Sequence, residues 1–386
     1  MKRYVSSDFS IGVLGGGQLG RMLIQAASNL DVNIKILDPN PNGPAAKMAY
    51  SYTQGDFRDY NAVLEFGKNC DLITVEIEDV NTDALRELIK QGKEVQPLPG
   101  VLDLIRDKGT QKQFYHKNGI PTAPFALFVN AAEIITAVNS GNLAFPFVQK
   151  LRTGGYDGKG VAIINSAKDL KKLLHGPSVI EQAANIKKEI GVIVAGSNAN
   201  NIPVCYPPVE MLFDPNANLV EFLSAPADIP ENIAKEAEKL ATKLYKKMGM
   251  RGLLAVEMFW NMDGSLWINE VAPRPHNSGH HSIEANPCSQ FEQHLRSILN
   301  WPLGSTKQEK AAVMINLLGD EFANGEVYYK GLDELLSLEG VYPHIYGKRE
   351  VSPYRKMGHV TVLADTREQA VSLGKTVKEL ITVKGV

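Results

Sequence analysis

The chain has little cysteine, no long apolar run and almost no excess of charge of either sign. Cys70, Cys205 and Cys288 lie far apart and form no CxxC pair, which argues against a disulfide framework and against a cysteine zinc site. No stretch approaches the roughly 18 consecutive apolar residues of a transmembrane helix, and no apolar run of signal-peptide length precedes the first predicted strand. We therefore expect a cytoplasmic protein that has no membrane partner.

The balance of charges argues against a second class of protein. The 41 Lys and Arg residues nearly match the 43 Asp and Glu residues, which leaves a formal net charge of -2. Such a balance does not predict the broad basic surface that a nucleic acid partner needs. The composition, with 44% hydrophobic residues, is that of a folded globular protein, and 386 residues predict two or three domains.

The first hundred residues alternate between apolar strands and an amphipathic helix. Ile11–Leu14 is a short apolar run, Leu19–Leu30 carries apolar residues at helical spacing, and Asn33–Leu37 reads as a second strand. Strand, helix and strand in this order form a βαβ unit, so the sequence predicts a parallel sheet. A segment containing proline and glycine at residues 96–100 indicates that this first domain spans residues 1–105.

Two further units are predicted after this domain. Residues 106–302 read as a second α/β region, with a lid subdomain at about residues 120–188. Within it, the strand Phe147–Lys150 runs into a glycine-rich segment and returns as the second strand of a hairpin. Residues 303–386 read as a small β-rich domain closed by an amphipathic helix. The predicted fold class is α/β (α+β).

The turn after the first strand has the glycine pattern of a phosphate-binding loop. Gly15, Gly17 and Gly20 fit GxGxxG, and Asp38 ends the next strand, where dinucleotide-binding proteins hold a ribose hydroxyl. Glycines let the backbone approach a phosphate, and the following helix offers free N–H groups. Because this physics serves any phosphorylated ligand, three interpretations stay open: a nicotinamide-dependent oxidoreductase, another phosphate-binding loop, or a turn without a ligand.

Two glutamates are predicted to face each other across a hairpin. Asp263-Gly264 is the signal of a two-residue type I′ turn, and in such a hairpin Glu257 pairs with Glu270. Their Cβ atoms would lie about 5 Å apart, where like charges destabilise the sheet unless a cation cancels them. Oxygen ligands without histidine or cysteine beside them favour Mg²⁺. The alternative, two solvated glutamates on an outward face, is weakened by the mostly apolar neighbours.

A lysine and a flexible glycine-rich tip follow one another in the lid. Lys150 ends the strand before Thr153–Gly160, which contains four glycines but departs from the P-loop pattern at both ends. Backbone N–H groups of such a tip, together with the lysine, could neutralise nucleotide phosphates. Tyr156 and Asp157 within the tip would then contact a second substrate. A mobile surface hairpin without this role is the alternative.

The polar segment after Glu270 is the fourth candidate feature. His276 and His280 have the i, i+4 spacing of a zinc pair, yet a proline and a glycine interrupt any regular helix there, and no HExxH glutamate is present. A loop that leaves the hairpin is better placed to orient a substrate. Arg274 could stabilise charge on a transferred phosphoryl group, and His276 with Asn277 could hydrogen-bond an anion or an amine.

Together these pieces resemble the ATP-grasp superfamily and, more narrowly, the N5-carboxyaminoimidazole ribonucleotide synthetase family. The resemblance covers nearly the whole chain. It is carried by GGGQLGRM (Gly15–Met22), DKGTQK (Asp107–Lys112), RTGGYDGKG (Arg152–Gly160), EQ (Glu181-Gln182), INEVAPRPHNSGHHSIEA (Ile268–Ala285), SQFEQHLR (Ser289–Arg296) and KMGHV (Lys356–Val360). It implies an ATP-grasp fold with an N-terminal Rossmann-like parallel-sheet domain and a small C-terminal β-rich domain.

The resemblance implies an ATP-dependent carbon–nitrogen ligase of purine biosynthesis. ATP would phosphorylate bicarbonate to carboxyphosphate, and the amine of 5-aminoimidazole ribonucleotide would capture the CO₂ that is released. ATP and Mg²⁺ are then the expected cofactors, a homodimer is the expected assembly, and a downstream N5-carboxyaminoimidazole ribonucleotide mutase is the metabolic partner. The rival interpretations are a formate-dependent glycinamide ribonucleotide transformylase of the same fold and a catalytically inactive ATP-binding scaffold.

The resemblance also implies a role for individual residues. The expected ATP-binding residues are Lys108, Lys150, Gly155, Gly158, Glu181, Gln182, Ala183, Glu189 and Asn269, and the expected Mg²⁺ ligands are Glu257 and Glu270. The residues expected around bicarbonate and the imidazole are Tyr156, Asp157, Arg274, His276 and Asn277. The ribonucleotide phosphate is expected at Gly17, Gln18 and Leu19, with Glu76, Lys348 and Arg355 nearby.

Overall fold

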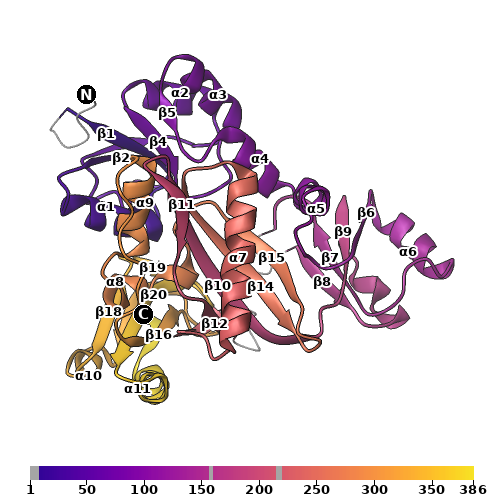
Figure 1. Cartoon of the computed structure of the whole chain (residues 1–386). Coiled ribbons are helices and arrows are strands. Elements are labelled where there is room, and N and C mark those ends of the chain that lie inside the picture. Colours follow the sequence, from indigo (N-terminus) through magenta and orange to yellow (C-terminus); the bar gives the residue numbers. More distant parts are fainter. Residues whose placement is uncertain (1–7, 156–159, 214–219) are drawn as a thin grey trace.

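The protein is built from β-sheets flanked by helices (Figure 1). This computed structural model describes residues 8–155, 160–213 and 220–386, and that part of the chain forms four sheets of five, nine, three and four strands. The four-stranded sheet lies to one side of the nine-stranded sheet, at the right of Figure 1. The five-stranded N-terminal sheet lies above the nine-stranded sheet in the same view. The predicted α/β class with a β-rich C-terminal part is confirmed.

The N-terminal sheet is wholly parallel, as the βαβ pattern predicts. Its order is β3-β2-β1-β4-β5, and every residue of β1 is buried, which explains why this strand reads as an uninterrupted apolar run. Gly15, Asp38 and Glu76 therefore meet at the carboxyl ends of three neighbouring strands, where ligands bind in such sheets. The elements are β1 (Ser10–Leu14), α1 (Gln18–Ser28), β2 (Asn33–Asp38), β3 (Ser51–Gln54), α2 (Tyr60–Lys68), β4 (Leu72–Val75), α3 (Thr82–Lys90), β5 (Glu94–Val95) and α4 (Pro99–Arg106).

The four-stranded sheet lies within the predicted lid at residues 120–188, and its strand order is β6-β9-β7-β8. Strands β7 and β8 pair antiparallel with Lys150 opposite Val161, so the predicted hairpin is confirmed. A small core of its own, which includes Ile134, Phe147 and Ile180, holds this unit together. The elements are α5 (Lys108–Lys117), β6 (Phe125–Phe128), α6 (Ala131–Asn139), β7 (Phe147–Leu151), β8 (Val161–Ile164), the 3₁₀ helix η1 (Ala167–Lys172) and β9 (Ser178–Gln182).

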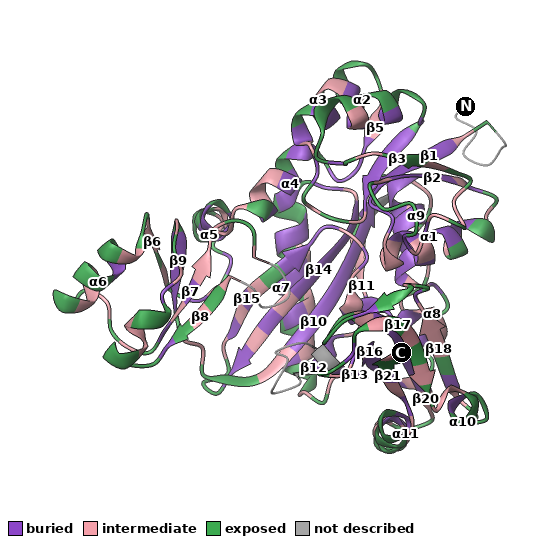
Figure 2. Cartoon of the chain, turned by 180° about the vertical axis from the view of Figure 1, so that it is seen from behind, coloured by how far each residue is buried: buried purple, intermediate pink, exposed green. Residues whose placement is uncertain are grey.

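The nine-stranded sheet joins the hairpin of the predicted metal site to the C-terminal region. Its path is β15-β14-β10-β12-β13-β16-β20-β18, and β11 pairs with β10. Strands β10 and β14 are buried along most of their length (Figure 2). The strands are β10 (Ile186–Ser197), β11 (Asn200–Cys205), β12 (Val209–Phe213), β13 (Val220–Ala225), β14 (Gly252–Asn261), β15 (Leu266–Ala272), β16 (Ala311–Leu318), β18 (Val341–Ile345) and β20 (Lys356–Ala364).

Strands β16, β18 and β20 of the C-terminal region thus extend this sheet, because β16 pairs with β13, whereas the three-stranded sheet of the same region is separate. The predicted domain limits at residues 105/106 and 302/303 stay a prediction. The remaining elements are η2 (Asn277–Gly279), α8 (Ser282–Ala285), α9 (Gln290–Ile298), β17 (Gly325–Lys330), α10 (Leu332–Leu336), β19 (Glu350–Val351), α11 (Arg367–Leu380) and β21 (Thr382–Gly385).

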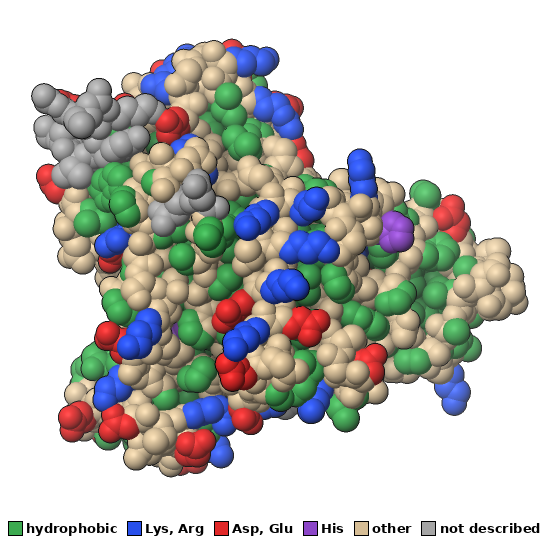
Figure 3. Space-filling model, viewed as in Figure 1, with side chains coloured by type: hydrophobic (Ala, Val, Ile, Leu, Met, Phe, Trp, Pro, Cys, Tyr) green, Lys and Arg blue, Asp and Glu red, His purple; other side chains and the backbone are tan. Residues whose placement is uncertain are grey.

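Helix α7 (Glu231–Met248) packs on the nine-stranded sheet with one apolar face. Ile233, Ala237, Leu240 and Leu244 recur at helical spacing and are buried, whereas the lysines of the helix lie exposed. The face over which α7 runs carries basic and acidic side chains near one another (Figure 3). Among the described residues, no helix is both long enough and apolar enough to cross a bilayer.

Candidate active site

The hairpin of β14 and β15 places Glu257 directly opposite Glu270, which confirms the predicted pairing. The predicted two-residue turn is wrong, however. Asn261 N–H donates to the Ser265 carbonyl at 2.9 Å, so the loop has three residues, and its last, Gly264, has a φ of 87°. This shifts the pairing by one residue until a bulge between Glu257 and Met258 restores it. The extra loop residue and the bulge shift the register by one residue in opposite directions, so Glu257 still lies opposite Glu270.

The bulge connects the hairpin to the lid. Met258 pairs with Ile268 and Glu257 with Glu270, which leaves Asn269 as the extra residue of β15. Its Oδ1 accepts a hydrogen bond of 2.8 Å from Lys150 Nζ, at the end of β7. Bulges re-aim side chains next to functional sites, and this one aims an amide at the lysine that was predicted to bind nucleotide.

Lys150 belongs to a buried triad of charges. The Glu181 carboxylate, 3% exposed, lies 3.1 Å from Lys150 Nζ and 3.1 Å from Lys112 Nζ. Burial would raise the pKa of Glu181, but the charges of the two lysines hold this pKa below its ordinary value. Burial lowers the pKa of Lys112 to about 8. The structure therefore brings two cations and one anion together, which leaves a net positive site beside the hairpin.

Lys112 was not predicted as a site residue from the sequence, although it belongs to the DKGTQK motif. It lies one helical turn after Lys108 on α5, so both side chains lie on one face of that helix. Lys108 opens α5, and its N–H donates to the Arg152 carbonyl at 2.9 Å. Asp107 caps the helix and binds the Arg152 guanidinium, which fixes α5 against the end of β7.

Glu189 lies on β10 beside the hairpin, opposite Phe259 of β14. Burial raises its pKa to about 7, and the nearby Lys150 opposes this rise. Gln182 ends β9 and is exposed, and Ala183 follows it. Gly155 lies at the edge of the described lid. Tyr156, Asp157 and Gly158 lie outside the described residues, so their predicted roles stay predictions.

The loop after β15 is tied to the N-terminal sheet and to the hairpin. Arg274 forms a double ion pair with Glu78, with distances of 2.9 Å from Nε to Oε1 and 3.1 Å from Nη2 to Oε2. His276 Nδ1 lies 3.7 Å from Glu257 Oε1 and 3.4 Å from the N–H of Ser278. Burial, then the charges of Arg274 and Lys356, lower the pKa of His276 to about 3. The imidazole is therefore neutral.

Asn277 adds a free donor to this loop. Its Nδ2 is buried and has no hydrogen-bond partner among the described residues. A buried amide without a partner is costly unless a ligand satisfies it. The predicted hydrogen-bonding role of this residue toward an anion or an amine stays a prediction, but the side chain is available for it.

The glycine turn is already filled by two carboxylates of the chain itself. Asp38 Oδ2 accepts from the N–H of Gly16 at 2.7 Å, and Glu76 accepts from the N–H groups of Gly17 and Leu19. Burial raises the pKa of Glu76, while its backbone donors oppose the rise. Asp38 is thus used to hold the turn, which weakens the dinucleotide interpretation. A phosphate at Gly17 or Leu19 would have to replace Glu76.

The two basic residues predicted for the phosphate lie in the C-terminal region. Lys348 Nζ donates to the Lys356 carbonyl at 2.6 Å, and the preceding Gly347 lies against Arg21 of α1. Lys348 is therefore brought close to the helix that follows the glycine turn. Arg355 is exposed and donates to the Glu350 carbonyl at 2.7 Å, within its own loop.

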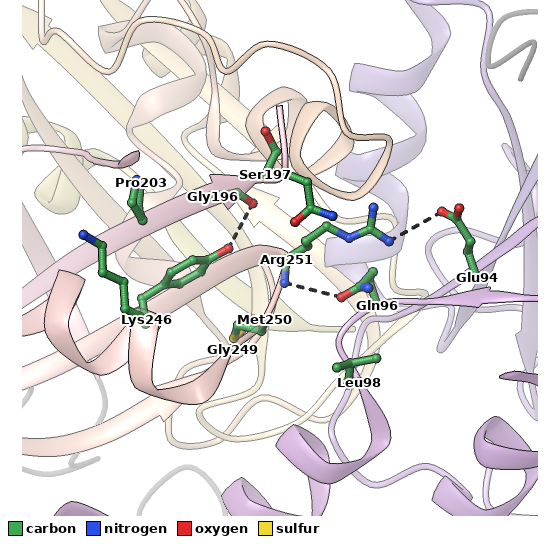
Figure 4. A pocket seen from close by; sticks show the side chains of 12 residues that line it. Glu94, Gln96, Leu98, Gly196, Ser197, Pro203, Lys246, Gly249, Met250 and Arg251 are labelled. Carbon is green, nitrogen blue, oxygen red and sulfur yellow. Dashed lines mark hydrogen bonds and ion pairs between the residues drawn. The ribbon is translucent and has the colours of Figure 1, made fainter. Parts of the chain in front are cut away.

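A cavity of about 750 Å³ lies elsewhere, between the N-terminal sheet and the carboxyl end of α7 (Figure 4). Glu94 and Gln96 line one side, and Lys246 and Arg251 line the other. The Arg251 guanidinium lies 3.5 Å from the Glu94 carboxylate and so ties the two walls together. No predicted site residue lines this cavity, so we place the chemistry at the hairpin.

Family models cover most of the chain. The ATP-grasp domain matches residues 113–291, the ribonucleotide synthetase preATP-grasp domain matches residues 9–106, and the phosphoribosylaminoimidazole carboxylase C-terminal domain matches residues 312–372. A hairpin that carries paired glutamates and contacts Lys150 fits this assignment. Fold and site together define a protein of the ATP-grasp class.

Whole-chain relatives narrow the class. N5-carboxyaminoimidazole ribonucleotide synthase of Staphylococcus aureus is 36% identical over 93% of this chain and 94% of its own length. The synthetase structure from Thermotoga maritima superimposes with a TM-score of 0.89 at 38% identity, over 98% of this chain and 100% of that one. The chain therefore belongs to the N5-carboxyaminoimidazole ribonucleotide synthase family.

Two other relatives add detail. The Aspergillus clavatus synthase in complex with ADP and 5-aminoimidazole ribonucleotide superimposes with a TM-score of 0.87 at 31% identity, over 97% of this chain and 98% of that one. Phosphoribosylaminoimidazole carboxylase of Candida glabrata is 37% identical over 93% of this chain, but the matched region covers only 64% of that protein. The chain thus spans about two thirds of the fungal carboxylase.

Proposed function

We propose that the protein carboxylates 5-aminoimidazole ribonucleotide with bicarbonate at the expense of ATP, giving N5-carboxyaminoimidazole ribonucleotide, ADP and phosphate. The observation that carries the proposal is the hairpin, in which Glu257 faces Glu270 while the bulged Asn269 reaches Lys150. Membership of the synthase family supports it. ATP and Mg²⁺ are the cofactors.

The residues at the hairpin fit Mg²⁺. Glu257 is 15% exposed and Glu270 is exposed, so both carboxylates are open to a ligand, and two like charges in opposite positions destabilise the strands without a cation. Oxygen donors alone suit this ion, which takes its further ligands from phosphates and water. When bound, Mg²⁺ would neutralise and orient the triphosphate.

The lid and α5 supply the positive charge that the nucleotide needs. Lys150 and Lys108 would contact phosphate oxygens. Glu181, which also pairs with Lys112, would hold the Lys150 ammonium in place. We assign the base and the ribose to the segment at Glu181, Gln182 and Ala183 and to Glu189. Gly155, Gly158 and Asn269 complete the proposed ATP-binding set.

The reaction then runs in three balanced steps. A bicarbonate oxygen attacks the γ-phosphorus, and the bond from that phosphorus to the bridging oxygen breaks, so that ADP leaves. The carboxyphosphate formed splits into CO₂ and phosphate. The exocyclic amine of the ribonucleotide forms a bond to the CO₂ carbon and gives a proton to the released phosphate.

The residues of the loop after β15 would stabilise the charges in these steps. Arg274 follows the end of β15 by two residues and would offer its guanidinium to oxyanions. Because the N–H of Ser278 donates to His276 Nδ1, the ring proton lies on Nε2. His276 therefore acts as a hydrogen-bond donor rather than a base. Tyr156, Asp157 and Asn277 are proposed as further contacts of bicarbonate and the imidazole.

The ribonucleotide is assigned to the junction of the glycine turn and the C-terminal region. Gln18 opens α1 beside Gly17 and Leu19, whose N–H groups Glu76 occupies. Lys348 and Arg355 would provide the cations for the phosphate. A homodimer in the cytoplasm, with a mutase that consumes the product, is part of the proposal.

One assay tests the proposed function. Release of ADP is measured with 5-aminoimidazole ribonucleotide plus bicarbonate, and with glycinamide ribonucleotide plus formate. We expect turnover in the first mixture alone, with ¹³C from labelled bicarbonate found in the ribonucleotide product. Turnover in the second mixture alone would reassign the protein to a transformylase. NADH binding without ATP binding would point to an oxidoreductase.

A further inference from the structure

Gln290, the first residue of α9, clamps the backbone of His276 by hydrogen bonds to both its N–H and its carbonyl group. Its Oε1 accepts from the N–H of His276 at 2.9 Å, and its Nε2 donates to the carbonyl of the same residue at 2.8 Å. The second Nε2 proton faces His280 Nδ1 at 2.9 Å. Gln290 is fully buried, so its three amide contacts are shielded from water.

The polarity of the backbone fixes how this amide is oriented. An N–H can only donate and a carbonyl can only accept, so the oxygen and nitrogen of the Gln290 amide cannot exchange places. The same amide must then donate to His280 Nδ1, which leaves the proton of that ring on Nε2. Burial keeps the pKa of His280 well below its ordinary value, in agreement with a neutral ring. The His276 and His280 rings thus have separate hydrogen-bonding partners, which are Ser278 and the Gln290 amide.

The loop is shaped to receive this side chain. A Cβ added to Gly279 would lie 2.7 Å from the Gln290 amide carbon, closer than real Cβ atoms approach. Gly279 does not have a positive φ, so the requirement for glycine here comes from Gln290 and not from the backbone conformation. Ser282 adds a second connection, because its Oγ donates to the Gly279 carbonyl and accepts from the N–H of Gln290 at 2.8 Å.

The helix that carries Gln290 is itself firmly held. Phe291, Leu295 and Ile298 of α9 are buried in a core shared with α1. Helix α9 also packs on β10 and β14, the strand of Glu257. The clamp therefore fixes the loop of His276 relative to the hairpin and to the glycine turn at once.

We propose that Gln290 is a positioning residue for the carboxylation, which holds the His276 imidazole beside the hairpin in the orientation that the reaction needs. The inference rests on the proposed function and adds a residue to it. Gln290 does not touch a substrate; it acts through the peptide of His276. Misplacing a catalytic group by about 1 Å can cost on the order of 100-fold in rate.

The chain contains a matched control one helical turn further on. Gln293 of α9 is also fully buried, and it clamps the backbone of Gly304 in the same way. Its Nε2 donates to the Gly304 carbonyl at 3.0 Å, and its Oε1 accepts from the N–H of Gly304 at 2.7 Å. Gly304 lies outside the proposed site. The same substitution at Gln290 and at Gln293 therefore distinguishes a positioning role of Gln290 in the reaction from a purely structural role.

The experiment compares Gln290→Met with Gln293→Met in the full-length protein, supplied with ATP, bicarbonate and 5-aminoimidazole ribonucleotide. Both variants lose a buried amide clamp, so we expect similar falls in Tm. For Gln290→Met we expect a fall in kcat of about 100-fold, with the KM for ATP within about two-fold of wild type. For Gln293→Met we expect kcat within about two-fold of wild type. Equal effects of the two substitutions on kcat would overturn the proposal.

Gln290→Glu gives a readout that a purely structural role does not predict. The introduced carboxylate repels the His276 carbonyl, but its protonated form can donate to that carbonyl. The ratio of its kcat to that of wild type should therefore rise as the pH is lowered from about 8.5 to about 6.5, because burial raises the pKa of a carboxyl group. A ratio that does not change with pH contradicts the clamp.

Gly279→Ala covers the case in which Gln290→Met does not fold. This change leaves Gln290 in place but pushes against its amide, so kcat should fall without a change in the KM for ATP. Wild-type kcat in Gly279→Ala would contradict the proposal. Failure of the proposed function has a different signature, since the wild-type protein itself would then release no ADP in response to bicarbonate and the ribonucleotide.

Discussion

Glu78 and Arg274 join two sheets through a double ion pair at 2.9 and 3.1 Å. Glu78 follows β4 of the N-terminal sheet, and Arg274 follows β15 of the nine-stranded sheet. Both side chains are less than one fifth exposed, and the hydrogen bond from Nη2, together with the ion-pair contact of Nε, holds the guanidinium against the Glu78 carboxylate. Arg274, which is proposed to stabilise oxyanions, is thus held in place by a carboxylate of the N-terminal domain.

Replacing Glu78 by Gln should therefore weaken the reaction without abolishing nucleotide binding. The amide keeps the size of the side chain but loses the charge that orients Arg274. We expect kcat/KM for bicarbonate to fall by about ten-fold or more, while the Tm shift caused by Mg-ATP stays as in wild type. Asp79→Asn is the control, because its carboxylate contacts the exposed Arg58 and Arg106 instead. An unchanged kcat/KM in Glu78→Gln would show that the ion pair is structural only.

Glu270→Gln should separate folding from turnover. Without metal, the substitution removes one of two like charges on opposite strands, so the Tm of the metal-free protein should stay the same or rise slightly. The increase in Tm on adding Mg-ATP should shrink, and turnover should fall by about 100-fold or more, because a charged ligand of the ion is lost. Turnover at the wild-type level would remove Glu270 from the site.

The pKa of Glu189 predicts a dependence of stability on pH. Burial raises this pKa to about 7 from its ordinary value of 4.5, so the folded state binds more protons than the unfolded state between these two pH values. The contribution of Glu189 to stability is then fully present below about pH 4.5 and is lost as the pH rises to about 7. The free energy of unfolding of wild type minus that of Glu189→Gln should fall across this window and level off above it. A flat difference in chemical denaturation would contradict the assignment.

Lys348→Ala should raise the KM for the ribonucleotide and leave the KM for ATP unchanged. Lys348 follows Gly347, which lies close to the Arg21 side chain of α1, and the proposed function assigns its charge to the ribonucleotide phosphate. We expect an increase in KM of about ten-fold, measured by varying 5-aminoimidazole ribonucleotide at saturating ATP. Lys239→Ala, on the exposed face of α7, is the control. If KM does not change, Lys348 belongs to the surface and not to the substrate site.

Local patterns predicted much of the fold and the pairing of the two glutamates at the candidate site. The apolar run Ile11–Leu14 in β1, the helical spacing in α1 and the glycine-rich hairpin of the lid were each predicted from short-range sequence patterns. The pairing of Glu257 with Glu270 was also correct, but through two errors that cancel. An Asp-Gly pair suits both two-residue and three-residue loops, and nothing local marks the bulge at Asn269.

The supporting residues could not be predicted in this way. The role of Lys112 is visible only in the folded protein, where Glu181 of β9 lies between Lys112 and Lys150. Gln290 reads as an ordinary polar residue at the start of a helix until the loop of His276 folds against it. Buried polar groups are satisfied by partners far along the chain, so their function becomes visible only when the tertiary structure is known.

The continuity of the nine-stranded sheet limits how the protein can be shortened. A fragment that ends at residue 302 would lack β16, and the hydrogen-bonding edge of β13 that now pairs with it would be left open. Leu223 and Met211, which share a core with Met314, would also lose their cover. An uncovered apolar edge of this kind promotes aggregation, so ATP binding should be studied on the intact chain.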